Sequence, residues 1–151
     1  MNRVRGFEFT REYLDAGLTL PARRTSGSAG YDLAAAGEFR LAPGAKAIIP
    51  TGMKAYMQPG EYLEIHIRSS LAIKQGLFLA NSQGIIDSDY YNNLENEGHI
   101  LIAVVNGGSC EFVVSQGMRI AQGIFCNYLL TDQDENDLKE QRGGGIGSTG
   151  Q

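Results

Sequence analysis

Hydrophobic and polar residues alternate with a period of two along most of the chain, the pattern of β-strands that bury one face. The clearest case is EYLEIHI (residues 61–67), in which Leu63, Ile65 and Ile67 alternate with polar side chains. The same criterion, together with glycine- and proline-containing turns, predicts further strands over residues 46–50, 52–60, 99–106, 110–114 and 119–130.

One segment, SSLAIKQG (residues 69–76), predicts a short helix. Ser69 or Ser70 is suited to cap its start, and Gly76 is suited to end it. Many short strands within 151 residues that include 20 glycines favour an all-β sandwich or jelly-roll barrel over an α/β layer fold.

The character of the chain changes after residue 130. Residues 131–140 carry five acids and one lysine, and residues 142–151 (RGGGIGSTGQ) contain five glycines. We therefore predict a β-barrel domain over residues 1–130, followed over 131–151 by an acidic linker and a flexible glycine-rich arm. Such a segment is typical either of a disordered tail or of an arm that wraps an anion with glycine amides, hydroxyls and a guanidinium.

Charge and composition exclude several classes of function. The net charge of −4 resides in residues 131–140, so the remainder is formally neutral, which argues against direct binding to nucleic acid. No apolar run is long enough for a membrane span, and the first ten residues are charged, so we expect a cytoplasmic protein without membrane contact. Cys110 and Cys126 have no partners at metal-ligand spacing and are expected in the core, and His66 and His99 on strand surfaces.

Five short segments mix glycine, hydroxyl, arginine and aspartate in a way that a core does not require: AGYDL (29–33), RSS (68–70), NSQGIIDSDY (81–90), GMRIAQ (117–122) and RGGGIGSTG (142–150). In this order they resemble the five motifs of the homotrimeric dUTP pyrophosphatases (dUTPases), from about residue 21 to 150. The resemblance implies hydrolysis of dUTP to dUMP and pyrophosphate with Mg²⁺. It also implies a homotrimer in which each active site takes motif 3 from one chain, motifs 1, 2 and 4 from a neighbour, and the arm from the third.

The resemblance assigns catalytic roles to three residues and a metal-binding role to a fourth. Asp87 would orient and deprotonate the attacking water, Gln122 would help to fix that water, and Arg68 would spread the charge of the transition state. Asp32 would hold hydrated Mg²⁺ through metal-bound water, which suits an ion that dehydrates reluctantly. Arg119 is expected in a surface or interface ion pair.

Nucleotide binding is assigned to three further groups. Tyr90 would pack against deoxyribose and leave no room for a 2′-hydroxyl, although a core tyrosine is the alternative. A hairpin that begins at Asn81 and includes Gly84 and Ile86 would recognise uracil. The phosphates would contact Ser69 and Ser70, with Ser70 alternatively capping the helix, and the closing arm would contribute Arg142, Ile146, Gly147, Ser148 and Thr149.

The chain departs from the family pattern in three places. Ile67 stands where proline commonly precedes the motif 2 arginine, and Ile146 stands where phenylalanine commonly stacks on uracil, so we expect only apolar covering of the base. An insertion over residues 91–97 is expected to alter access to the site or subunit contacts, or to bind a regulatory protein partner.

Two alternatives come from related folds. The dCTP deaminases share the RSS segment but carry a catalytic glutamate three residues before an asparagine, and here Asn106 follows Ala103, so that base is absent. A non-catalytic nucleotide sensor is disfavoured because Asp32, Asp87 and Gln122 are retained, and turnover of dUTP distinguishes the two.

Overall fold

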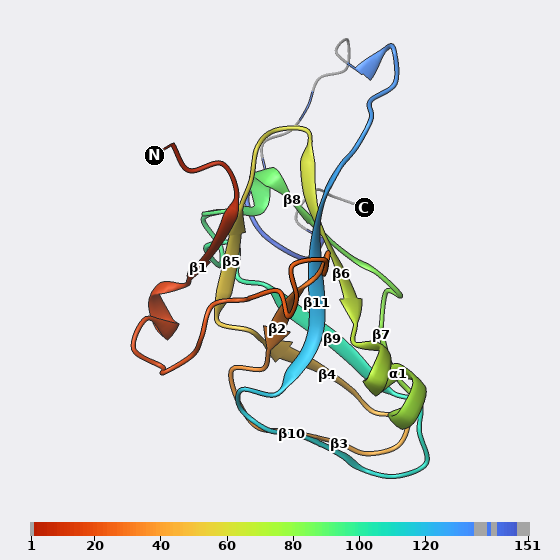
Figure 1. Ribbon diagram of the computed structural model, residues 1–151. Helices are drawn as coiled ribbons and strands as arrows, with labels where there is room; N and C mark the ends of the chain where they lie inside the picture. The colour runs from red at the N-terminus through yellow and green to blue at the C-terminus, as the bar shows by residue number, and fades with distance from the viewer. Residues whose placement is uncertain (1, 135–138, 140–141, 148–151) are drawn as a thin grey trace.

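The computed structural model describes residues 2–134, 139 and 142–147 of the chain (Figure 1). Short strands dominate it, with one α-helix and two 3-10 turns among these residues. In chain order the elements are β1 (Gly6–Phe9), η1 (Arg11–Tyr13), β2 (Tyr31–Ala34), β3 (Phe39–Leu41), β4 (Lys46–Pro50), β5 (Met53–Tyr56), β6 (Glu61–Ile67), α1 (Ser69–Gln75), β7 (Leu77–Leu79), β8 (Gly84–Asp87), η2 (Ser88–Tyr90), β9 (Leu101–Asn106), β10 (Phe112–Val114) and β11 (Arg119–Asn127).

The strands form antiparallel sheets around one apolar core. A four-stranded sheet has the order β2-β11-β6-β8, a three-stranded sheet has the order β4-β9-β7, and β1-β5 and β10-β3 form pairs. Leu33, Leu41, Ile49, Leu63 and Val114 come from different strands of these sheets and are fully buried in the same core. The prediction of an all-β jelly-roll fold with one short helix is confirmed.

β6 carries the alternation that the sequence shows. Leu63 and Ile65 are 0% and 2% exposed, whereas Glu64 and His66 between and beside them are partly exposed. Burying a leucine or isoleucine side chain contributes about 1.5–3 kcal/mol, so this face fixes which side of β6 points inward.

Some predicted strands are shorter in the structure. The segment predicted over 52–60 is paired only as far as Tyr56, because the chain turns at Gln58–Glu61, where Gly60 has a φ of 85°. The segments predicted over 99–106, 110–114 and 119–130 are strands over the bounds of β9, β10 and β11.

The helix prediction is confirmed in position but wrong in its cap. α1 ends at Gly76, which has a φ of 71°, as expected. Its N-cap is Arg68, with no side-chain hydrogen bond, because Ser69 and Ser70 already lie within the first helical turn. The two hydroxyls are therefore not used to cap α1, and both serines are exposed.

Three of the minor expectations are wrong. Cys110 is exposed and Cys126 is half-buried, with its Sγ 3.4 Å from a carboxylate oxygen of Glu64, so neither cysteine is a core residue. His99 lies before β9 rather than on a strand, and its Nε2 accepts a hydrogen bond from the Gly52 amide at 2.9 Å.

Among the described residues, no helix combines the length and apolar character that crossing a bilayer requires.

Candidate active site

A pocket of about 410 Å³ lies beside β8 and η2, a volume within the range of small-molecule sites. The structure brings together here the residues predicted for the base and sugar and part of the predicted arm. These lining residues are Asn81, Gly84, Ile86, Asp87, Tyr90, Arg142, Ile146 and Gly147.

The turn that connects β7 with β8 forms one wall of the pocket. The predicted hairpin is wrong in its pairing, because β7 pairs with β9 and β8 pairs with β6, in two different sheets. The turn is tight: Ser82 has a φ of 59°, and the Gln83 amide donates to the Asn81 carbonyl at 2.7 Å. β8 then pairs with β6, with Gly84 opposite Ile65. A Cβ at position 84 would lie 2.9 Å from the Cβ of Ile65, so glycine is needed for this close approach.

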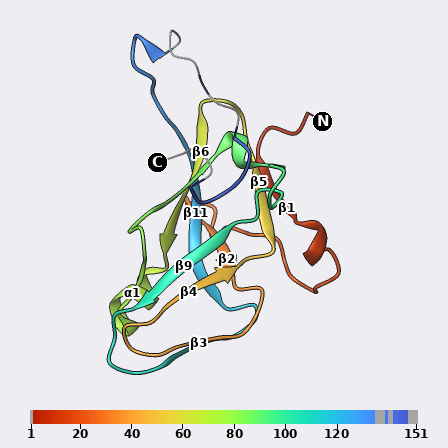
Figure 2. The same cartoon turned by 180° about the vertical axis from the view of Figure 1, so that it is seen from behind.

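Asp87 ends β8 at the mouth of the pocket, with its side chain 48% exposed. Its carboxylate pairs closely with the guanidinium of Arg142, and Asp89 accepts a second hydrogen bond from Arg142 Nε at 2.8 Å. In both views the arm residues 142–147 pass next to η2 (Figures 1 and 2). The predicted catalytic carboxylate therefore contacts the predicted phosphate-binding arginine directly.

Tyr90 is 8% exposed and lines the pocket, so it is both a buried residue and a wall of the site. Its hydroxyl donates to the His99 carbonyl at 2.7 Å and accepts from Asn96 Nδ2 at 2.9 Å. Burial raises the pKa of this phenol above its ordinary value. The ring is thus held rigidly in the wall of the pocket.

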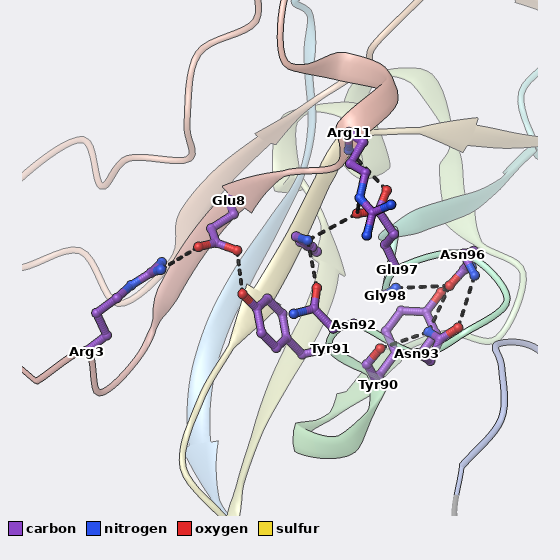
Figure 3. Close-up of polar contacts among 11 residues, drawn as sticks. Arg3, Glu8, Arg11, Tyr90, Tyr91, Asn92, Asn93, Asn96, Glu97 and Gly98 are labelled. Atoms are coloured by element: carbon purple, nitrogen blue, oxygen red, sulfur yellow. Dashed lines mark hydrogen bonds and ion pairs between the residues drawn. The ribbon is translucent and has the colours of Figure 1, made fainter.

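The inserted loop, residues 91–97, is bound tightly to the body of the protein (Figure 3). Asn93 is buried, and its side chain donates to the Tyr90 carbonyl and accepts from the amides of Glu95 and Asn96. Lys54 Nζ of β5 lies 2.7 Å from Asn92 Oδ1.

The ends of the inserted loop contact the N-terminal segment. The hydroxyl of Tyr91 donates to Glu8 of β1, and the Arg11 amide donates to Glu97 at 3.1 Å. The Arg11 amide and, to a lesser extent, Lys54 hold the pKa of the Glu97 carboxyl below its ordinary value.

A second cluster of predicted residues lies where β2, β6 and β11 meet. The carboxylate of Asp32 is 2.8 Å from Arg119 Nη1 and 3.8 Å from Arg68 Nε, and its side chain is 15% exposed. The ion pair expected for Arg119 is confirmed. Two guanidinium groups around one carboxylate leave a net positive charge, which suits phosphate binding.

Gln122 lies on β11 between Asp32 of β2 and His66 of β6. Its side chain packs over Gly30, where an added Cβ would lie 2.6 Å from Gln122 Oε1. Sequence reasoning quoted Gly30 only as part of a motif, so its role in giving the glutamine room was missed. Ser69 and Ser70 follow Arg68 directly and are exposed at this end of the molecule.

The two groups of predicted residues stand far apart within one chain. Asp87 is opposite Tyr62 near the start of β6, and Arg68 follows six residues later, which corresponds to roughly 20 Å along an extended strand. Figures 1 and 2 show the same separation, with η2 near one end of the molecule and α1 near the other. The structure therefore does not bring Asp87 together with Arg68.

Asp32 is the residue predicted to hold Mg²⁺. Among the residues described, no three side chains of histidine, cysteine, aspartate or glutamate are grouped as a metal cage. Asp32 offers a single carboxylate beside two guanidiniums. Because both guanidiniums already pair with it, this carboxylate fits Mg²⁺ only through metal-bound water, with the ion's other ligands supplied by water and by the phosphates that the cluster binds.

Part of the predicted arm lies outside the described residues, namely Ser148 and Thr149. The described part, residues 142–147, lies over the pocket of its own chain. In the structure this arm contacts the pocket of its own chain, whereas the resemblance expects the arm to come from a third chain. Ile146 is 86% exposed at the pocket mouth, so it covers the opening without being packed.

Comparison with known proteins gives one consistent result. A family model described as dUTPase matches residues 17–150. A deoxyuridine 5′-triphosphate nucleotidohydrolase of Lactococcus lactis is 51% identical over 148 residues, which cover 98% of this chain and 99% of that protein. A protein of the same name from Bartonella henselae is 38% identical and covers 89% of this chain and 77% of its own length.

Solved structures agree with these sequence matches. The crystal structure of a dUTPase from Streptococcus mutans superposes with a TM-score of 0.79 at 48% identity, covering 84% of this chain and 98% of that one. The dUTPase of phage phi11 of S. aureus, at 19% identity and a TM-score of 0.72, shares the fold. The matched residues include both the pocket and the arginine cluster.

Proposed function

The chain belongs to the dUTPase family, and from this premise we propose that it hydrolyses dUTP to dUMP and pyrophosphate by attack of water on the α-phosphate. This activity limits uracil incorporation into DNA and supplies dUMP for thymidylate synthesis. Apart from the family match, the observation that carries the proposal is the position of Asp87 at the mouth of a nucleoside-sized pocket.

The pocket supports discrimination of base and sugar. Backbone groups of the segment from Asn81 to Ile86 recognise uracil. A rigid backbone has no room for the 5-methyl group of thymine, and it rejects the exocyclic amine of cytosine because that donor would face a backbone donor. Tyr90 is fixed by two hydrogen bonds, so its ring does not move aside for a ribose 2′-hydroxyl. Ile146 and Gly147 cover the base from the arm.

Asp87 positions the attacking water. A carboxylate is a weak base at neutral pH, so most of its contribution comes from orientation. Arg142 pairs with Asp87 in the structure. For Arg142 to bind the γ-phosphate, as the family likeness implies, its guanidinium exchanges the carboxylate for phosphate, which releases Asp87 to act on water.

The arginine cluster serves the phosphates. Arg68 spreads the charge of the transition state, Ser69 and Ser70 contact phosphate oxygens beside it, and Gln122 helps to fix the water. Asp32 would hold Mg²⁺ through metal-bound water, and the ion would supply charge neutralisation for the triphosphate. Ser148 and Thr149 complete the phosphate contacts from the arm.

The separation of Asp87 from Arg68 supports an active site shared between chains. A triphosphate cannot bridge a fixed distance of roughly 20 Å while its α-phosphate reacts next to both groups. We propose a homotrimer in which the Asp87 pocket of one chain faces the Arg68 cluster of a neighbour.

The remaining assignments follow from this activity. Residues 1–130 form the catalytic body, and residues 131–151 form the linker and arm. A cytoplasmic location fits an enzyme that acts on free deoxynucleotides, without direct contact with nucleic acid or membrane. A regulatory protein partner at the inserted loop remains a prediction.

The experiment that tests the proposal is incubation with dUTP, dCTP, dTTP and UTP in the presence of Mg²⁺, followed by chromatography of the nucleotides. We expect conversion of dUTP to dUMP and no conversion of the others. Deamination of dCTP would support the related deaminase, whose base position is occupied here by Ala103 in the pocket wall. Binding of dUTP without product would support a nucleotide sensor.

A further inference from the structure

The inserted loop is a fixed part of the body rather than a free surface segment. Asn92 and Glu97 are held by Lys54 of β5, and Tyr91 is held by Glu8 of β1. The loop therefore has a defined position at the mouth of the nucleotide pocket. Two of its side chains, Glu95 and Asn96, line that pocket.

Glu95 contacts the backbone of the arm. Its Oε2 accepts a hydrogen bond from the Gly145 amide at 2.7 Å. A Cβ at Gly144 would lie 1.7 Å from the same oxygen and 3.1 Å from the Cβ of Glu95, so an alanine at position 144 would displace the Glu95 carboxylate from this contact. Ile146 is 86% exposed and contributes little burial, so polar contacts hold this stretch in place.

Asn96 connects the inserted loop with the wall of the pocket. Its Nδ2 donates to the Tyr90 hydroxyl at 2.9 Å, while its Oδ1 accepts from the Gly98 amide and from Asn93 (Figure 3). A Cβ at Gly145 would lie 3.3 Å from Asn96 Nδ2 and 3.4 Å from the Tyr90 hydroxyl. The arm, the loop and Tyr90 thus meet at one point.

We propose that the inserted loop is the docking site of the glycine-rich arm, with Glu95 as a positioning residue that holds the arm closed over the nucleotide pocket. Asn96 fixes Tyr90 beneath the arm. The expected effect of Glu95 on turnover rests on the proposed function, whereas the docking of the arm on the loop does not require that function. In the structure, the arm and the loop that it contacts belong to the same chain.

The test compares Glu95→Ala and Glu95→Gln with Leu94→Ala as a matched control. Leu94 is the preceding loop residue and is 97% exposed. We expect Glu95→Ala to lower kcat/KM for dUTP about 2- to 10-fold, the range for losing one solvent-exposed hydrogen bond. Glu95→Gln retains an acceptor oxygen and restores most of the loss, and Leu94→Ala behaves as the unaltered protein.

Docking is also measured without turnover, by limited trypsin digestion in which mass spectrometry follows cleavage after Arg142. The docked arginine is engaged by Asp87 and Asp89 and is a poor trypsin substrate. We expect faster cleavage in Glu95→Ala but not in Glu95→Gln or Leu94→Ala. Unchanged thermal unfolding of the three variants would exclude a general loss of structure.

A double-mutant cycle makes the assignment specific. Gly144→Ala forces the Glu95 carboxylate away and is expected to speed cleavage by itself, but to add little in the Glu95→Ala background. Equal cleavage rates in Glu95→Ala and the unaltered protein would overturn the docking site. Faster cleavage with unchanged kcat/KM would overturn the positioning role. If the unaltered protein did not hydrolyse dUTP, the proposed function would fail while the digestion still decided the docking.

Discussion

Mixing two inactive variants tests whether the active site is divided between chains. Asp87→Asn removes the carboxylate at the pocket, and Arg68→Ala removes the guanidinium roughly 20 Å away on the same chain. If each site takes these groups from different chains, a mixed assembly contains sites with both groups intact. Neither variant assembled alone has such a site.

The recovered activity follows from chain statistics. In an equimolar mixture that is dissociated and reassembled at random, a site is intact when the chain with the pocket carries Arg68→Ala and its neighbour carries Asp87→Asn. Each condition is met half of the time, so about a quarter of the activity of the unaltered protein is expected at equal subunit concentration. The assay is dUMP release, with native mass spectrometry to confirm exchange of subunits.

A matched negative control uses Arg68→Ala with Gln122→Ala. Both residues belong to the arginine-cluster end of the same chain, so no site in the mixture has both intact, and the activity does not rise above the mean of the two variants measured separately. Verified subunit exchange without recovery in the Asp87→Asn and Arg68→Ala mixture would refute the shared site. Recovery of activity in the control mixture would show that Arg68 and Gln122 of one active site come from different chains.

Three further predictions concern single residues. Asp87→Asn is expected to slow kcat by roughly 10²–10⁴ while affinity for a non-hydrolysable dUTP analogue, measured by calorimetry, changes only a few-fold. Gly30→Ala is expected to displace Gln122 and to lower kcat by up to about 10²-fold, whereas Gly27→Ala, where an added Cβ meets nothing within 4 Å, leaves kinetics unchanged. Burial lowers the pKa of His99, so below its ordinary value of about 6.5 the unfolded chain binds the proton more readily than the folded one. The free energy of unfolding is therefore expected to fall as pH decreases through this range, by up to about 1.4 kcal/mol per pH unit. Thermal melts of His99→Gln should show a correspondingly smaller loss of stability as pH decreases.

The sequence predicts the long elements of the fold better than the short ones. β6 spans seven residues with a strict alternation, which is enough to recognise a period of two. β3 and β7 span three residues each, too few for any period to be read. Their pairing with β10 and β9 depends on residues distant in the chain, so only the structure shows it.

Some residues of the candidate site are likewise found from the sequence, and others only from the structure. The segment from Asn81 to Tyr90 is found from the sequence because it resembles one of the five dUTPase motifs. Glu95 is 50 positions from Gly145, and nothing in the local sequence indicates that its carboxylate accepts that amide. Gly30 is likewise missed, because the reason for a glycine there is a side chain on another strand.

The structure has a rigid sheet and a weakly held arm, and this difference would allow one fold to support both the proposed shared site and the proposed closing arm. β6 is paired with β11 along its whole length and with β8 from Tyr62 to Ile65. Moving Arg68 toward Asp87 would break several of these hydrogen bonds, each worth about 0.5–1.5 kcal/mol, so assembly of chains is the less costly way to bring the groups together. The arm is held by the Gly145 hydrogen bond and by partly exposed ion pairs at Arg142, contacts worth about 1 kcal/mol each. It can therefore open and close in every catalytic cycle without disturbing the sheet that holds the two halves of the site.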